Sequence, residues 1–163
     1  MVLTLAGRGE EAIAVCLKGL EISPDYPYLL LRLGFAYVST GNFEKAIEAF
    51  EKGAAATGRS PAFLDLLGEA YVLSGQRKKA EQIVKELASI ARKRYVSSIH
   101  RGGLYTSLAM HDWDQAFAIL EEGLRERANY VSYLRTVPLP HMYPEFRTTS
   151  RFQSLIARLK IPE

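Results

Sequence analysis

The sequence predicts an all-α fold in which antiparallel helix pairs stack into a solenoid that ends in a capping helix. Tyrosine recurs at an interval of 34 residues, at Tyr37, Tyr71 and Tyr105. Two glycine series keep the same interval, namely Gly34, Gly68, Gly102 and Gly7, Gly41, Gly75. Apolar residues also recur at three- and four-residue steps on both sides of a short glycine-containing turn, which is the pattern of paired amphipathic helices.

The composition is that of an ordinary folded chain. Its 163 residues are 48% hydrophobic and 24% charged, which suffices for one substantial core and excludes intrinsic disorder, collagen and a disulfide scaffold. A single cysteine, Cys16, cannot form an internal disulfide. The net charge of +3 is too small to indicate nucleic acid or an acidic membrane surface by itself. No apolar run is long enough to span a bilayer, so we expect no membrane insertion.

The first half of the chain divides into one partial and two complete units. Residues 1–26 match only the second helix of a unit, and residues 27–60 and 61–94 each form a complete helical hairpin. Pro27 and Pro61 occupy first-turn positions, where the missing N–H costs nothing. Gly41 and Gly75 end the first helix of each hairpin, because a left-handed residue lets the chain reverse there. The expected helices run roughly over residues 27–40 and 43–56 in the first complete unit.

Residues 95–129 are expected to form a degenerate third unit. It keeps the alignment of Gly102 and Tyr105 but departs from the pattern at Ser98 and Arg101. Its alanine, Ala116, follows Ala80 by 36 residues, so we predict a turn between Met110 and Asp114 that is two residues longer than in the other units. The Gly102-Gly103 pair is expected to lie within a helix.

Residues 130–163 should form a linker and a capping helix. Pro138, Pro140 and Pro144 mark a turn-rich connection that cannot continue a helix. A helix then starts near Ser150, capped by Thr149 or Ser150, and it leaves Arg151, Arg158 and Lys160 to solvent. Its apolar stripe consists of Phe152, Leu155, Ile156 and Leu159. Such a helix would cover the open apolar face of the last unit.

The repeated residues resemble the tetratricopeptide repeat. The pattern of that family is filled by Leu30, Leu33-Gly34, Tyr37, Ala46 and Phe50 in one unit, and by Leu64, Leu67-Gly68, Tyr71, Ala80 and Val84 in the next. The resemblance implies a right-handed superhelical solenoid. The stretch over residues 146–156 is also similar to the tail that ends tetratricopeptide regions of bacterial multidomain signalling proteins.

The resemblance further implies a concave groove lined by the first helix of each unit, in which a peptide or helix binds. Residues of this chain at the family's groove positions include Tyr28, Leu31, Phe35, Val38, Asp65, Glu69, Val72 and Ile99. Each of these side chains has internal packing as its alternative role. Tyr28, Phe35, Asp65 and Glu69 are the strongest candidates for partner contacts.

No motif in the sequence supports catalysis, a cofactor or a metal site. The three histidines, the single cysteine and the carboxylates form no catalytic constellation, and no phosphate-binding loop is present. Cys16 stands at the position of Phe50, so we expect a buried structural thiol. The stretch His111 to Asp114 is expected to be an exposed turn with a helix cap rather than a metal site. The chain is therefore predicted to be non-catalytic.

The leading function is a protein-interaction scaffold that forms a regulatory part of a larger bacterial protein. A homo-oligomerisation module is the alternative, because the partial first unit leaves an apolar edge to be covered. Binding of nucleic-acid backbone through the basic cluster at residues 92–101 is a distant third. Without a secretion signal the fragment is expected in the cytoplasm, or in the periplasm if an upstream membrane anchor exists.

Overall fold

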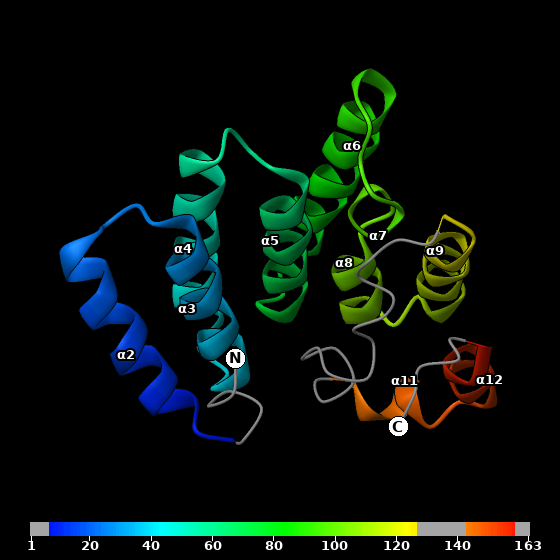
Figure 1. Cartoon of the computed structure of the whole chain (residues 1–163), viewed down its shortest axis with the longest axis horizontal. Coiled ribbons are helices and arrows are strands. Elements are labelled where there is room, and N and C mark those ends of the chain that lie inside the picture. Colours follow the sequence, from blue (N-terminus) through cyan, green and yellow to red (C-terminus); the bar gives the residue numbers. More distant parts are fainter. Residues whose placement is uncertain (1–6, 127–142, 159–163) are drawn as a thin grey trace.

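The computed structural model describes residues 7–126 and 143–158, and all regular structure in these two ranges is helical. Figure 1 shows helices that follow one another along the chain. Their order is α2(Gly9–Ile22), α3(Pro27–Ser39), α4(Phe43–Ala56), α5(Pro61–Leu73), α6(Arg77–Lys93), α7(Ser98–Arg101), α8(Leu104–Ala109), α9(Trp113–Arg125), α11(Pro144–Arg147) and α12(Ser150–Arg158). The two complete hairpins are α3 with α4 and α5 with α6.

The turns within these hairpins have the predicted chemistry. Pro27 and Pro61 lie in the first turn of α3 and α5. Gly41 and Gly75 adopt left-handed φ angles of 74° and 79°. The residue after each glycine donates its backbone N–H to a carbonyl in the last turn of the preceding helix. Asn42 donates to the Tyr37 carbonyl at 2.9 Å, and Gln76 donates to the Tyr71 carbonyl at 2.7 Å. These bonds satisfy carbonyls that would otherwise lack a partner at the helix ends.

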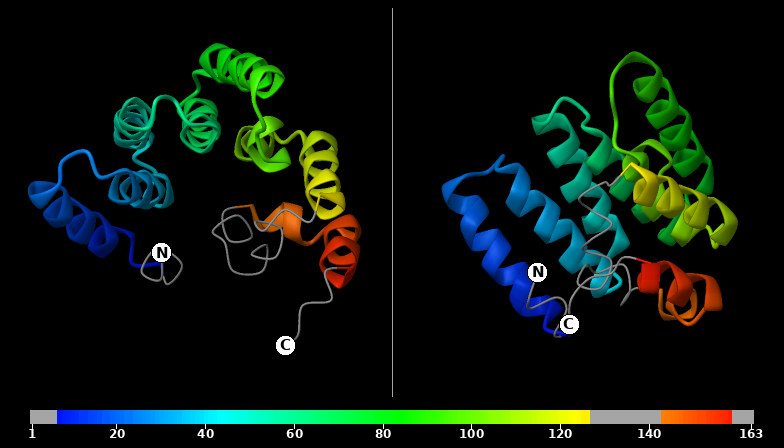
Figure 2. Two further views of the ribbon diagram at one scale, coloured as in Figure 1. Left: turned by 45° about the horizontal axis from the view of Figure 1, so that its top comes forward. Right: turned by 45° about the vertical axis from the view of Figure 1, so that its right-hand side comes forward.

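The helices form a curved array. Each helix from α2 to α6 packs against the next one along the chain, and α5 also packs against α8. Figure 2 shows α3, α5 and α8 on the inner side of an arc and α4, α6 and α9 on its outer side. The observed architecture is therefore an all-α solenoid of antiparallel helix pairs, as predicted.

Gly34 and Gly68 leave room for side chains of neighbouring helices. A Cβ atom added to Gly34 would lie 2.2 Å from the ring of Phe50, and one added to Gly68 would lie 2.2 Å from Thr106 Oγ1. The nearest atoms thus belong to side chains on α4 and α8. A ring edge and a hydroxyl fill the space that a methyl group would need.

The third unit differs from its prediction in two respects. The connection from α8 to α9 consists of Met110, His111 and Asp112, so it is as long as the other two turns, and the prediction of a longer turn is wrong. The additional residues lie in α6, which has 17 residues against 14 in α4. The expected continuous helix is also broken, because Gly103 has a left-handed φ of 68° and separates α7 from α8.

Tyr105 is out of register with the other two repeated tyrosines, because Ser107 rather than Tyr105 accepts the backbone N–H at the following turn as Tyr37 and Tyr71 do. Tyr37 and Tyr71 each lie beneath the ammonium group of a lysine, at 5.7 Å from Lys45 and 5.1 Å from Lys79. Tyr105 instead lies 6.0 Å from the ring of Phe35. All three rings are buried, and those of the two complete units share the contact with a lysine.

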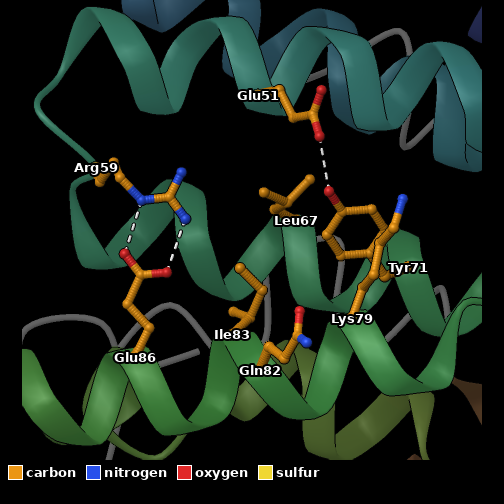
Figure 3. A pocket seen from close by; sticks show the side chains of 8 residues that line it. All are labelled: Glu51, Arg59, Leu67, Tyr71, Lys79, Gln82, Ile83 and Glu86. Atoms are coloured by element: carbon orange, nitrogen blue, oxygen red, sulfur yellow. Dashed lines mark hydrogen bonds and ion pairs between the residues drawn. The ribbon is translucent and has the colours of Figure 1, made fainter.

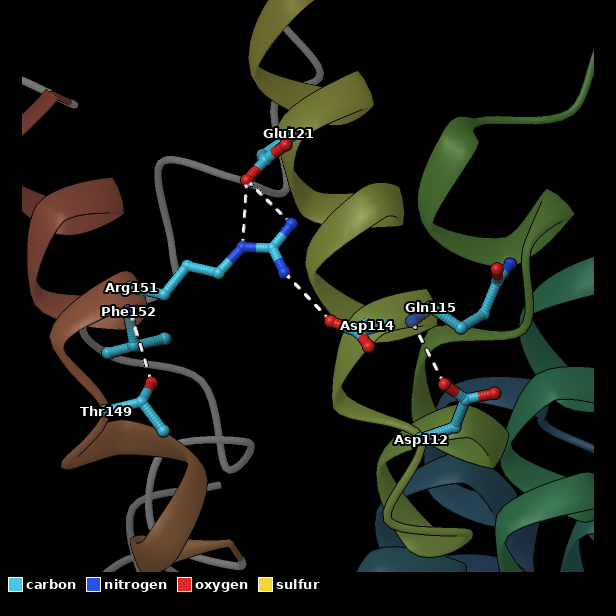
Figure 4. Close-up of polar contacts among 7 residues, drawn as sticks. All are labelled: Asp112, Asp114, Gln115, Glu121, Thr149, Arg151 and Phe152. Atoms are coloured by element: carbon cyan, nitrogen blue, oxygen red, sulfur yellow. Dashed lines mark hydrogen bonds and ion pairs between the residues drawn. The ribbon is translucent and has the colours of Figure 1, made fainter.

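The C-terminal segment covers the last hairpin. Phe146 of α11 stacks on Phe117 of α9, with 4.5 Å between ring centroids, and lies 5.5 Å from Phe152 of α12. Arg151 reaches from α12 to Glu121 and Asp114 on α9 (Figure 4). Thr149 Oγ1 accepts the Phe152 N–H at 3.2 Å, so the predicted cap is confirmed.

The capping helix is therefore confirmed over the described residues 150–158. Several features of the predicted C-terminal region, namely Pro138, Pro140, Leu159 and Lys160, lie outside the described ranges.

Candidate functional site

The predicted groove residues divide into exposed and buried side chains. Tyr28 is 54% exposed, and Leu31 and Val72 are half-buried. The other five are buried in the structure: Phe35, Val38, Asp65, Glu69 and Ile99. Much of the expected groove lining therefore contributes to the interior, and Tyr28 is the one predicted site residue with most of its side chain open to a partner.

Asp65 joins α5 to the broken helix of the third unit. It is fully buried, and its Oδ1 accepts the Thr106 N–H at 3.1 Å and the Thr106 hydroxyl at 3.3 Å. The imidazole Nδ1 of His100 lies 3.4 Å from Oδ2 of the same carboxylate. Thr106 is the third residue of α8, so its N–H has no partner within that helix. Asp65 on α5 thus caps the start of α8. A side chain next to the helix start usually has this role.

Glu69 lies one turn further along α5 and meets the C-terminal segment. Tyr143, the residue before α11, donates its hydroxyl to Glu69 Oε1 at 2.6 Å. Both side chains are buried, and Glu69 Oε2 has no hydrogen-bond partner among the described residues. The described part of the C-terminal segment therefore reaches α5, 74 residues earlier in the sequence.

The surroundings of Glu69 favour its neutral form. Burial raises the pKa of Glu69 to about 8, and the negative charge of Asp65 acts in the same direction, while the hydrogen bond from Tyr143 opposes it. Burial and the neighbouring carboxylate also raise the pKa of the Tyr143 phenol well above its usual value. A large part of the Glu69 population consequently holds a proton at neutral pH.

Aromatic and cationic groups lie at the other end of the inner face. The Arg32 guanidinium stacks over the ring of Tyr28 at 4.6 Å, and the Tyr26 ring lies 6.4 Å from that of Tyr28. Tyr26 is 51% exposed. This end therefore presents an open aromatic surface with a positive charge beside it, whereas α5 contributes two buried carboxylates.

A separate pocket of about 340 Å³ opens on the outer side of the array (Figure 3). Its apolar floor is formed by Leu67 and Ile83, and Arg59 makes two hydrogen bonds of 2.7 Å to Glu86 at one end. At the other end the Tyr71 hydroxyl donates to Glu51 at 2.7 Å. The polar groups at both ends of the pocket thus satisfy one another, and Lys79 in its lining lies 5.1 Å from the Tyr71 ring.

The predicted basic cluster is only partly available to a ligand. Arg101 pairs with Glu122 at 2.6 Å and with Glu126 at 3.0 Å. Arg92, Lys93 and Arg94 are exposed at the end of α6. Arg101 therefore has a structural role in joining α7 to the end of α9.

The remaining chemical candidates have structural roles where the structure describes them. Cys16 is buried, as predicted, and burial raises the pKa of its thiol. Asp112 caps α9 by accepting the Gln115 N–H at 3.1 Å, which confirms the predicted turn and cap (Figure 4). Within residues 7–126 and 143–158, no three histidine, cysteine or carboxylate side chains gather as a metal site. The same ranges contain no helix that is long and apolar enough to cross a membrane.

A comparison with protein families decides the identity of the repeat. Residues 3–68 match the model of the tetratricopeptide repeat family. Residues 3–68 therefore consist of tetratricopeptide repeats. The match covers the partial unit, the first complete unit and the start of the second, where the helix pairs are most regular. No curated protein matches the sequence.

The match to tetratricopeptide repeats over residues 3–68 indicates a general class of activity. Such repeats generally mediate protein–protein interactions, and their fold is generally a non-catalytic scaffold. His100 and Tyr143, which contact the two carboxylates of α5, were not among the predicted groove residues. The available signal was the spacing of Asp65 and Glu69, because two carboxylates four residues apart on an otherwise apolar helix require nearby donors.

Proposed function

We propose that this chain is a non-catalytic scaffold that holds a peptide or helix of a protein partner on the inner face formed by α3, α5 and α8. The exposed aromatic surface at Tyr28, beside the half-buried Leu31, is the observation that carries the proposal. An exposed aromatic side chain next to aliphatic surface is typical of residues that dominate the binding energy of protein interfaces. In this proposal the buried side chains shape the surface and Tyr28 makes direct contact. The scaffold serves as a regulatory part of a larger bacterial protein.

A selection experiment tests this proposal. A phage-displayed library of random 16-residue peptides is selected against the chain, and the affinity of the selected peptides is measured by titration calorimetry. We expect the double variant Tyr28→Ala/Leu31→Ala to bind them about 10-fold more weakly or worse. Tyr95→Ala is the matched control, because Tyr95 is a 79% exposed tyrosine outside the inner face. Failure to select a peptide, or equal weakening in both variants, would contradict the proposal.

Self-association is the second candidate, and it is favoured by the outer surface of α2. Val15 and Ile22, which are 61% and 85% exposed, lie two turns apart on one face of α2. An apolar surface of this kind is typical of an interaction site. Light scattering coupled to size-exclusion chromatography would show a dimer that Val15→Glu/Ile22→Glu converts to a monomer. A monomeric wild-type chain at high micromolar concentration would exclude this candidate.

A further inference from the structure

We propose that Tyr143 occupies the place of a partner's arginine, so that binding of a partner segment displaces Tyr143 from Glu69. This inference rests on the proposed function and specifies the chemistry of the partner. It also assigns a regulatory role to the C-terminal segment, which competes with the partner for the inner face.

The first argument is the incomplete hydrogen bonding of Glu69. Its carboxyl group is fully buried, yet Tyr143 supplies one donor to Oε1 and no described residue supplies one to Oε2. A phenol has only one O–H, so it cannot satisfy both oxygens. A guanidinium group carries two parallel N–H donors with the spacing of the two carboxylate oxygens. An arginine therefore fits this position better than the tyrosine that holds it.

The second argument is the charge around the position. Asp65 and Glu69 lie on the same face of α5, and His100 is the one described basic group within 4 Å of either carboxylate. The carboxylate of Glu145 adds further negative charge near Tyr143. Among the described residues, an incoming cation would thus meet two buried carboxyl groups and one nearby basic group, His100. Lysine would supply the charge without the bidentate geometry, so arginine is the preferred residue.

The third argument is that Tyr143 can leave without unfolding the C-terminal segment. Phe146, Phe152 and Arg151 hold α11 and α12 on α9 through ring contacts and ion pairs. The attachment of Tyr143 to α5 is separate from these contacts, because it depends on Glu69 rather than on α9. The side chain of Tyr143 can therefore turn away while the cap remains in place.

The protonation of Glu69 supplies an independent readout. Because Glu69 is largely neutral at neutral pH, a guanidinium that binds it as a carboxylate must release the proton to solvent. The titratable groups facing this site in the described structure are Asp65, His100, Tyr143 and Glu145. Calorimetry in phosphate and in Tris, whose ionisation enthalpies differ, measures the number of protons released.

The test uses an arginine-containing peptide from the selection and the same peptide with citrulline, a neutral isostere, in place of arginine. We expect the citrulline peptide to bind the wild-type chain about 10-fold more weakly or worse, and Glu69→Gln to abolish the difference. Tyr143→Phe, which lacks the competing hydroxyl, should bind the arginine peptide roughly 5-fold more tightly. In the wild type, the ¹³Cζ NMR signal of labelled Tyr143 should move to the position of a solvated tyrosine on saturation.

The outcomes separate this inference from the proposed function. Equal affinity for the two peptides, or an unchanged Tyr143 signal in a saturated complex, would overturn the inference while leaving the scaffold proposal intact. The NMR measurement needs no substitution, so it decides the question even if Tyr143→Phe fails to fold. Failure of every library peptide to bind both the wild type and Tyr143→Phe would overturn the two proposals together.

Discussion

The inner helices of the second and third units show how one repeat can be built in two ways. The second unit has α5, an unbroken helix of 13 residues. The third has α7 and α8, of 4 and 6 residues, separated at Gly102 and Gly103. A broken helix exposes additional backbone donors and acceptors, which must find partners in the interior. Asp65 on the regular helix satisfies one of these donors, so the irregular unit depends on the regular one.

The comparison also shows which features of a unit are fixed. The turn that follows the inner helix is conserved in geometry across the three hairpins, because the backbone N–H groups of Asn42, Gln76 and Asp112 make equivalent bonds of 2.9, 2.7 and 2.9 Å. Helix lengths vary instead. The additional length of α6 and the break at Gly103 occur away from this turn, so the hairpin reversal itself is unchanged.

Removal of the Asp65 carboxylate should have the largest effect on the irregular unit. Asp65→Ala leaves the buried N–H of Thr106 without its acceptor, while the Thr106 hydroxyl keeps the backbone carbonyl of residue 65, and we expect the free energy of unfolding to fall by on the order of 3 kcal/mol. Asp65→Asn keeps an oxygen acceptor and should lose less. Urea unfolding followed by circular dichroism measures both. Asp114→Ala is the matched control, because the side chain of Asp114 is 99% exposed. Equal losses at Asp65 and Asp114 would disprove the capping role.

The second carboxylate on α5 should make stability depend on pH. Because the pKa of Glu69 is raised to about 8 in the folded chain, the folded state binds more protons than the unfolded state, and stability falls as pH rises from about 4.5 to 8. Glu69→Gln removes this dependence. Its advantage over the wild type should grow from near zero at pH 4 to on the order of 5 kcal/mol at pH 9.

Urea unfolding at pH 4, 6 and 9 tests this dependence. The matched control is Glu48→Gln, which changes an exposed glutamate on α4 and should leave the pH profile unchanged. A Glu69→Gln advantage that is the same at pH 4 and pH 9 would show that the proton of Glu69 has no part in it.

The close approach of α5 and α8 should make Gly68 sensitive to a single methyl group. In Gly68→Ala the new Cβ would lie 2.2 Å from Thr106 Oγ1, which is itself held by hydrogen bonds to Asp65. We expect a loss of about 1–3 kcal/mol, because a buried hydroxyl with fixed partners cannot move aside cheaply. Thermal unfolding measures the change. A melting temperature equal to that of the wild type would show that the two units are packed less tightly than the structure describes.

The smallest effect is expected at the turn that all three hairpins share. His111 adopts a left-handed φ of 59° at the position that Gly41 and Gly75 occupy in the other hairpins. His111→Gly should stabilise the chain by about 0.5 kcal/mol, and Gly75→His should destabilise it by about 1 kcal/mol. Opposite signs for the two substitutions in urea unfolding would support the equivalence of the turns. Equal signs would contradict it.

The sequence was sufficient for features that depend on neighbouring residues. Helix α4 was predicted to begin at Phe43 and end at Ala56, and α12 to begin near Ser150, because caps, prolines and glycine turns act within a few residues. The break at Gly103 was missed because its stabilising partner, Asp65, lies far earlier in the chain. The contact between Tyr143 and Glu69 was missed for the same reason. A periodic pattern describes the average unit and contains no information about how one unit departs from it.

Trp113 is the one tryptophan in the chain, and the centroid of its indole lies 5.3 Å from the ring centroid of Phe146. This arrangement gives the protein a natural optical reporter at the junction between the last hairpin and the C-terminal segment. Its emission should shift to longer wavelength when α11 separates from α9, while far-ultraviolet dichroism follows the solenoid as a whole. Detachment of the segment and melting of the repeats can thus be followed as distinct events in unlabelled protein.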